Sequence, residues 1–491
     1  MSIHEKLRDA KRLEHILGLL LKYELGHLLN KFSLSQLLPF HKRLNLSKHD
    51  NGKDAVKLRK VFESLGGAFI KLGQFLSLRP DFVGKEIADE FKKFQDNLDS
   101  FSFEEVHQIL ESELKQPIDK IFSRFNVKQI AAASIGQVHE ATLIDGRKAA
   151  VKVQRPGIQE VIKADIDIMK FFSDYIEKHN EKARKLKIRR IIEEFEKYTG
   201  KELNYMDEAR NIGMFHDFFK NDKNVKVPRV YFDFCTNKIL VMEFIDGKKI
   251  TEDVKVDREK VSRVLTNFFL RQFFLLKNFH ADPHPGNIFL MKDGKIALLD
   301  YGIVGRLGGG LSDKVKVLFL AMLQGNTEKV ANAFIQMGAL DESVDVESFR
   351  IDLSDALWPF YNVELKRIKV GESLKTILDL AFKYNMELPR DFILLAKSII
   401  TLEGYCVELY PEYNFVKVVE PFVKSIEGDL TEKTISKLYE QLSNLKDNLI
   451  KIPAQINLLL NKINKGKLRV EMGRSEVEEV VEELELGTNR R

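Results

Sequence analysis

The sequence predicts a mixed α+β fold of two lobes, with additional helices at both ends of the chain. Two hairpins of short apolar strands, within residues 138–154 and 288–299, are separated by long stretches with the periodicity of helices. The 491 residues suffice for about three units of domain size, and a hydrophobic content of 44% supports a large core. Charged residues make up 31% and the two signs are intermixed, which excludes a largely disordered chain.

Residues 1–60 are predicted to form an amphipathic helical arm, with a row of apolar side chains and basic residues beside it. Such a helix lies either in a membrane interface or on the rest of the protein, and the sequence leaves both alternatives open. The apolar positions are Leu13, Ile16, Leu17, Leu20, Leu21, Tyr23 and Leu28.

Residues 61–117 form the next predicted segment, which starts with an apolar helical stripe over residues 61–78. Three glycines in this stripe would let the helix pack closely against a neighbour. Lys71 and Gln74 also lie on it, and from periodicity alone they would belong to its solvent-exposed face.

Residues 118–249 are predicted to form a small lobe, in which Lys152 lies on the second strand of the first hairpin. Its apolar neighbours favour a lysine that reaches the phosphates of a nucleotide over a lysine that faces solvent. Helices are expected between residues 158 and 211 of this lobe.

The segment before this hairpin stands where a glycine-rich phosphate-binding loop would be expected, yet it contains a single glycine. Alanine side chains restrict the dihedral angles of a backbone and its close approach to phosphates. We therefore expect nucleotide handling that differs from that of ordinary kinases. The segment consists of Ala131, Ala132, Ala133, Ser134, Ile135 and Gly136.

Residues 250–424 are predicted to form a mostly helical large lobe that carries three polar groups in the order of a phosphoryl-transfer site. Asp282 precedes Asn287 in one loop, and Asp300 follows just after the second hairpin. Because that hairpin brings its two ends together, the three side chains are expected to meet at one point. The first carboxylate would orient the attacking hydroxyl or water, and the amide and the second carboxylate would hold magnesium against the phosphates.

An isolated Asp and Asn in such a loop would more simply cap turns. The loop, the hairpin and the triplet Asp300-Tyr301-Gly302 together favour the phosphoryl-transfer interpretation instead. His280 is interpreted as a structural residue of the loop. For His284 a metal-ligand role and a turn-stabilising role are both open, and the second is favoured.

With these motifs the chain resembles the UbiB-type family of atypical protein-kinase-like proteins, also called the aarF-domain or ubiquinone-biosynthesis family. The similarity extends over residues 61–424. Its most specific parts are Lys71-Leu72-Gly73-Gln74, which matches the family's KxGQ motif, and the alanine-rich segment 131–136. Residues 202–211 match the family's ExD region, although Asn204 replaces its Asp and weakens any charge-pairing role there. The metal triplet contains Tyr301 in place of the usual Phe.

The resemblance implies a bilobal protein-kinase-like fold in which the KxGQ extension lies over the active site, in the groove where protein kinases hold a peptide. It implies that Lys152 contacts phosphates and pairs with a glutamate, with Glu208 preferred and Glu202 as the alternative. It also implies a hinge at residues 242–245 whose backbone grips adenine. The implied residues are Asp282, Lys152 and Lys71 for catalysis, Asn287 and Asp300 for magnesium, and Gln74, Glu202, Glu208, Glu243, Ile245 and segment 131–136 for the nucleotide.

The expected function is that of an ATP-binding, magnesium-dependent atypical kinase or ATPase that supports isoprenoid-quinone or other prenyl-lipid metabolism at a membrane. The expected cofactors are ATP or ADP and magnesium. The expected partners are a membrane surface, prenyl-lipid or quinone intermediates, and lipid-biosynthesis proteins. Two alternatives stay open: a small-molecule phosphotransferase of the aminoglycoside or choline kinase type, and a pseudokinase scaffold that binds nucleotide without turnover.

Composition and charge narrow the class of protein. The net charge of +5, from 78 basic and 73 acidic residues, is small and indicates no nucleic-acid partner. Two cysteines, Cys235 and Cys406, indicate a reducing compartment without a disulfide framework. No stretch reaches the roughly 18 apolar residues of a membrane span, so a peripheral membrane contact and a cytoplasmic location are expected. The polar residues 425–491 are predicted to form a helical tail.

Overall fold

The computed structural model describes most of the chain up to residue 427. The predicted tail after that residue, residues 78–82 beyond the KxGQ motif, and Ala133 and Ser134 of the alanine-rich segment lie outside the described residues. The chain divides into two compact units, residues 1–420 and 421–491, and the elements below belong to the first unit except for the end of the last helix. The described residues are 3–31, 54–77, 83–94, 100–132, 135–180, 184, 188–250, 256–337, 345–361, 369–384, 386 and 388–427.

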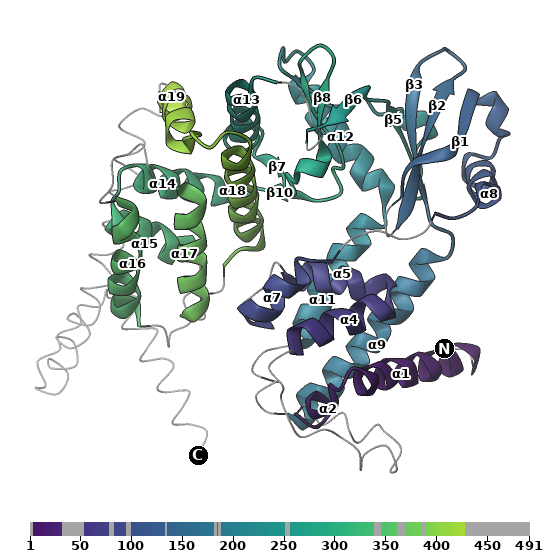
Figure 1. Cartoon of the computed structure of the whole chain (residues 1–491), viewed down its shortest axis with the longest axis horizontal. Helices are drawn as coiled ribbons and strands as arrows, with labels where there is room; N and C mark the ends of the chain where they lie inside the picture. The colour runs from purple at the N-terminus through teal and green to yellow at the C-terminus, as the bar shows by residue number, and fades with distance from the viewer. Residues whose placement is uncertain are drawn as a thin grey trace, which may run out of the picture. The chain divides into compact units, whose positions relative to one another are not determined.

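The first helices pack on one another and on the small lobe (Figure 1). The apolar side chains of α1 are buried against α4 and α9, so the structure shows the second of the two alternatives for the N-terminal arm. Arg12 of α1 donates hydrogen bonds to Asp165 of α9 and to the carbonyl of Leu65. The elements are α1 (Ile3–Lys22), α2 (Gly26–Lys31), α4 (Asp54–Leu65), α5 (Gly67–Ser77), α7 (Lys85–Phe91) and α8 (Phe103–Leu114).

The stripe 61–78, predicted as one helix, is two helices, α4 and α5. The break falls at Gly66 and Gly67, whose φ angles of 65° and 47° lie in the left-handed region that ends a right-handed helix. Gly73 does serve close packing, because a Cβ there would lie 2.1 Å from the ring of Phe94. The helix that carries the KxGQ motif, α5, is therefore shorter than the predicted one and separate from α4.

The small lobe is built on an antiparallel sheet in the order β1-β2-β3-β5, which contains the expected hairpin around Lys152. Ala131 and Ala132 pair with β2, so the alanine-rich segment is strand up to residue 132 rather than loop throughout. Strand β5 likewise continues to Glu243, which pairs with Ala149, so half of the expected hinge is strand. The elements are β1 (Phe122–Ala132), β2 (Gly136–Leu143), β3 (Lys148–Gln154), β5 (Ile239–Glu243), α9 (Ile158–His179), α11 (Ile188–Glu202) and α12 (Tyr205–Phe219).

A second four-stranded sheet, in the order β4-β9-β8-β6, carries the other expected hairpin, β8–β9. A two-stranded sheet of β7 and β10 lies at the loop that contains Asp282. The apolar segment 268–276, within the large lobe that was predicted to be mostly helical, is the end of α13 followed by a π-helical turn at Gln272–Leu276. The strands are β4 (Val225–Lys226), β6 (Gly247–Lys249), β7 (Asn278–His280), β8 (Ile288–Met291), β9 (Ile296–Leu298) and β10 (Val304–Arg306).

Helices make up the rest of the described chain, so the mixed α+β fold class is confirmed. None of the described helices has both the length and the apolar character that a membrane span needs. The α-helices are α13 (Arg258–Arg271), α14 (Leu311–Leu323), α15 (Thr327–Met337), α16 (Val346–Tyr361), α17 (Val370–Lys383), α18 (Arg390–Leu409) and α19 (Phe415–Glu427), and short 3₁₀ turns lie at Ile118–Lys120, Phe232–Phe234 and Pro285–Asn287.

Candidate active site

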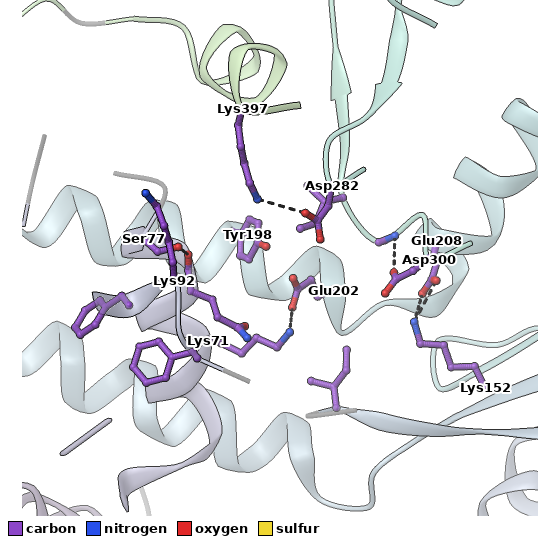
Figure 2. Close-up of a pocket in the computed structure, with 16 residues that line it drawn as sticks. Lys71, Ser77, Lys92, Lys152, Tyr198, Glu202, Glu208, Asp282, Asp300 and Lys397 are labelled. Atoms are coloured by element: carbon purple, nitrogen blue, oxygen red, sulfur yellow. Dashed lines mark hydrogen bonds and ion pairs between the residues drawn. The ribbon is translucent and has the colours of Figure 1, made fainter. Parts of the chain in front are cut away.

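A cavity of about 250 Å³ brings together side chains from α5, α11, α12, β3, α18 and the loops after β7 and β9. Figure 2 shows three lysines that reach carboxylates around it, each from a different part of the chain. Eight of the residues expected at the site line this cavity: Lys71, Gln74, Ile135, Lys152, Glu202, Glu208, Asp282 and Asp300.

Lys152 of β3 forms an ion pair with Glu208 of α12, with its Nζ 2.8 Å and 3.1 Å from the two carboxylate oxygens. The two side chains are only 14% and 4% exposed, and the Nζ also lies 4.9 Å from the centre of the Tyr205 ring. Burial by itself would lower the pKa of Lys152, but the charges of Glu208 and Asp300 outweigh it and raise that pKa. The lysine is therefore charged at neutral pH.

Asp300 is exposed toward the cavity and lies in the left-handed region with a φ of 59°. Two contacts hold this conformation: its carboxylate accepts a hydrogen bond from the Gly302 amide at 3.3 Å, and its carbonyl accepts one from His280 Nε2 at 2.8 Å. The charge of Lys152 lowers the pKa of the Asp300 carboxyl, against the effect of the surrounding protein. Asp300 thus presents an ionised carboxylate to the cavity.

His280, the last residue of β7, positions Asp282, and His284 shapes the loop that follows. His280 is buried, accepts a hydrogen bond from the Asp282 amide at Nδ1, and donates from Nε2 to the Asp300 carbonyl. Burial lowers the pKa of His280, which favours the neutral ring that this pattern requires. His284 accepts a hydrogen bond from the Gly286 amide, the turn-stabilising arrangement favoured from the sequence.

Asn287 ends the same loop and is tied to it by its own side chain. Its Nδ2 donates to the Asp282 carbonyl at 3.4 Å, and its carbonyl accepts from the Leu299 amide at 2.9 Å. The second contact closes the β8–β9 hairpin and sets Asn287 next to the strand end that leads to Asp300. Asn287 is not among the residues that line the cavity.

The KxGQ lysine is buried rather than solvent-exposed. Lys71 is 8% exposed, and its Nζ lies 3.0 Å from Glu202, the residue weighed as an alternative partner of Lys152. Burial and the neighbouring Glu202 carboxylate raise the pKa of the Tyr198 hydroxyl well above its ordinary value. Asn204 caps α12 by accepting a hydrogen bond from the Met206 amide, a role that an amide fills as well as the carboxylate of the family's Asp.

Several other expected residues lie apart from the cavity. Gly136 is explained by packing, because a Cβ there would lie 2.4 Å from the Tyr205 hydroxyl and 2.5 Å from the Val153 carbonyl. The Glu243 carboxylate lies 2.7 Å from Lys226 Nζ, and Ile245 is buried. The expected residues that do not line the cavity are Ala131, Ala132, Gly136, Glu243, Ile245 and Asn287.

Sequence reasoning missed Lys397, whose Nζ lies 3.5 Å from the Asp282 carboxylate. It also missed Tyr198 and Lys92, which line the cavity. A signal for Lys397 was present, because it is a single charged residue within the apolar run 392–400 of α18. Such a lysine in a core-facing helix has to reach a polar surface.

The donor set at the cavity fits magnesium bound together with a nucleotide. No group of three or more His, Cys, Asp or Glu side chains suited to a metal occurs among the described residues. Magnesium at phosphoryl-transfer sites typically takes one or two protein carboxylates and completes its shell with waters and phosphate oxygens. The ionised Asp300 would supply the carboxylate ligand at the cavity, and Asn287, which ends the neighbouring loop outside the cavity lining, would have to supply its amide oxygen. Lys152 would contact the phosphates.

Comparisons with known proteins match two consecutive parts of the chain to described domains. Residues 93–334 match the family model described as the ABC1 atypical kinase-like domain, and residues 353–414 match the UbiB helical domain. The chain is 32% identical to the "Probable protein kinase UbiB" of Azotobacter vinelandii, over 85% of this chain and 81% of that protein. It is 34% identical to "Protein ACTIVITY OF BC1 COMPLEX KINASE 1, chloroplastic" of Arabidopsis thaliana, over 83% of this chain and 63% of that protein.

A solved structure shows the same fold. The complex of Rv3197 with erythromycin from Mycobacterium tuberculosis matches 75% of this chain and 95% of its own, with a TM-score of 0.54 and 24% sequence identity.

Proposed function

Because the chain belongs to the UbiB family of ABC1-type atypical kinase-like proteins, we propose that it binds ATP or ADP with magnesium and acts as an ATPase or kinase-like phosphotransferase. The observation that carries this proposal is that Lys152, Glu208, Asp282 and Asp300 line one cavity. In this proposal residues 118–249 form the small lobe and residues 250–424 the large lobe.

The cavity residues and the neighbouring Asn287 each have a separate task. Lys152, held by Glu208, neutralises charge on the phosphates that are not transferred. Asp282, held by the His280 ring, orients the attacking water or hydroxyl and takes its proton. Asp300 and Asn287 would hold magnesium, which, when bound, would neutralise charge that develops on the phosphate oxygens. All of these residues orient reactants or neutralise charge, and none has to form a covalent intermediate.

Residues 61–117 act in the proposal as an extension that limits access to the site. Lys71 and Gln74 of α5 line the cavity, and the Lys71–Glu202 ion pair ties α5 to α11. With α5 in this place, phosphorylation of another protein's peptide is not expected. If α5 gates the site, Lys71→Ala changes nucleotide affinity or autophosphorylation, whereas Lys60→Ala on the exposed side of α4 does not.

The proposal places this activity in isoprenoid-quinone or prenyl-lipid metabolism, with peripheral contact to the cytoplasmic face of a membrane and with lipid-biosynthesis proteins as partners. The family resemblance and the relatives named UbiB support it. The test is ATP hydrolysis by the purified chain with and without liposomes, joined to identification of lipids that co-purify. Stimulation by liposomes and a co-purified prenyl lipid are expected; no effect of liposomes and no such lipid would refute the membrane role.

The same assay separates the two other functions that the motifs allow. A small-molecule phosphotransferase would turn over ATP only when a soluble hydroxylated substrate is added, independently of liposomes. A nucleotide-binding scaffold would bind ATP without hydrolysis, and Asp300→Asn would leave its cellular function intact. Hydrolysis that Asp300→Asn abolishes would exclude the scaffold.

A further inference from the structure

Lys397 is a cavity residue that comes from outside the kinase-like part of the chain. It lies on α18, within the segment that matches the UbiB helical domain, whereas Asp282 lies within the segment that matches the ABC1 domain. Its Nζ is 3.5 Å from Asp282 Oδ1, and Figure 2 shows the side chain reaching from its helix to that carboxylate. A helix of the C-terminal domain thus contributes a positive charge next to the loop that carries Asp282.

The position of Lys397 is fixed by its neighbours on α18. The hydroxyl of Ser398 donates to the His280 carbonyl at 3.3 Å, directly before the loop that contains Asp282. At the start of α18 the Asp391 carboxylate accepts a hydrogen bond from the Arg306 amide of β10 at 3.2 Å. These two contacts dock α18 on the β7–β10 sheet and hold Lys397 over the loop.

The loop itself has no lysine or arginine between residues 280 and 287. Its two histidines are engaged in backbone hydrogen bonds, His280 with the Asp282 amide and His284 with the Gly286 amide. Any cation on the attacking side of the transferred group therefore has to come from another element, and Lys397 is placed to supply it.

Three of the lysines that line the cavity pair with carboxylates that also line it, and these pairs differ in how firmly they are held. The carboxylates that pair with Lys152 and Lys71 are 4% and 10% exposed, and the contacts are 2.8 Å and 3.0 Å. Lys397 and Asp282 are 31% and 38% exposed and lie 3.5 Å apart. An exposed pair at this distance contributes little stability, so its ammonium can leave the carboxylate for a stronger anion at small cost.

We propose that Lys397 is a catalytic residue of the phosphoryl-transfer reaction: it pairs with Asp282 before nucleotide binds and contacts the transferred phosphoryl group during turnover. The inference rests on the proposed function. Asp282 orients the attacking oxygen, so an ammonium beside its carboxylate lies next to the phosphorus that this oxygen attacks. Negative charge spreads over the oxygens of the transferred group in the transition state, and a cation placed there stabilises it.

The step balances without a further reactant. The attacking oxygen forms a bond to the γ-phosphorus while the bond from that phosphorus to the β–γ bridging oxygen breaks, and the electron pair leaves with ADP. The proton of the attacking hydroxyl or water passes to Asp282. Lys397 keeps its protons and donates a hydrogen bond to an oxygen of the transferred group.

The test compares Lys397→Met and Lys397→Arg in the full chain by steady-state hydrolysis of magnesium-ATP and by calorimetric titration with magnesium-ADP. The methionine keeps the length of the side chain and removes its charge. We expect kcat to fall about 100-fold, as for the loss of one donor to a developing anion. KM and the affinity for ADP stay within about two-fold, because ADP lacks the transferred group, and the arginine restores at least about a tenth of kcat.

A matched control is Lys417→Met, on the exposed side of α19 and outside the cavity, which leaves kcat unchanged. A kcat within about two-fold of the unmodified chain in Lys397→Met would overturn the inference alone. So would equal losses of kcat and ADP affinity, or no rescue by arginine in a variant whose thermal unfolding midpoint is unchanged. Absence of ATP hydrolysis in the unmodified chain would overturn the proposed function together with this inference.

Discussion

Replacing Lys152 by methionine removes the ammonium that contacts both oxygens of Glu208, at 2.8 Å and 3.1 Å. The Glu208 carboxylate, 4% exposed, is then left beside the negative charge of Asp300. Removing one partner of a buried ion pair costs about 3–5 kcal/mol, because the other charge loses its compensation. We expect this loss in the free energy of unfolding of Lys152→Met.

Replacing the other partner of the pair, in Glu208→Gln, is expected to lower the free energy of unfolding by less. Lys152 keeps the nearby charge of Asp300, which already contributes to its raised pKa. The double variant is expected to be more stable than the sum of the two single losses predicts, with a coupling of about 1–3 kcal/mol, because neither charge remains alone. In Glu208→Gln, Lys152 is expected to pair with Asp300 instead. Because Asp300 is the proposed magnesium ligand, magnesium-dependent nucleotide binding should be weaker in this variant.

The assay is a double-mutant cycle. Urea unfolding of the unmodified chain, the two single variants and the double variant is monitored by circular dichroism. The matched control is Lys148→Met, four residues earlier on the same strand, where the lysine side chain is 63% exposed and lies 3.5 Å from Glu140. An exposed pair of this kind contributes at most about 1 kcal/mol. If Lys152→Met loses no more free energy of unfolding than Lys148→Met does, the buried ion pair does not have the large effect predicted here.

Two further predictions concern buried polar groups. The fully buried Tyr301 hydroxyl has no hydrogen-bond partner among the described residues, so Tyr301→Phe is expected to raise the free energy of unfolding by about 1–3 kcal/mol, measured by urea unfolding; a decrease would contradict this. Burial raises the pKa of Glu403, which accepts hydrogen bonds from the Val370 and Gly371 amides, to about 7. Since the folded chain then binds this proton more tightly than the unfolded chain, stability falls as pH rises from the ordinary pKa of 4.5 to about 7, by about 3 kcal/mol. Thermal unfolding of Glu403→Gln between pH 4.5 and pH 7.5 should lack this decline, and an identical pH profile would refute it.

The residues that sequence analysis placed at the cavity lie in short motifs whose local geometry is set by turns. Asp282 and Asp300 meet because the β8–β9 hairpin closes between the Asn287 carbonyl and the Leu299 amide. Lys152 lies on the second strand of its hairpin, as predicted, where it pairs with Val138 of the first strand. In both regions the information lies within about twenty residues of the site.

Other features depend on contacts between distant segments. The pair of Lys397 and Asp282 joins residues 115 positions apart, and the periodicity of α18 does not say which loop it covers. The apolar face of α1 fits a membrane and a protein surface equally, and only the packing on α4 and α9 decides between them. The break at Gly66 was missed because the apolar spacing continues across it, while the positive φ that glycine permits ends the helix.

We propose above that one cavity binds a nucleotide and magnesium between Lys152 and Asp300. The most direct test of this proposal is calorimetric titration of ADP into the purified chain with magnesium, without magnesium, and into Asp300→Asn with magnesium. We predict binding with magnesium and an affinity lower by about ten-fold or more in the other two titrations. Equal affinity in all three titrations, or no binding in any, would show that this cavity is not a magnesium-dependent nucleotide site.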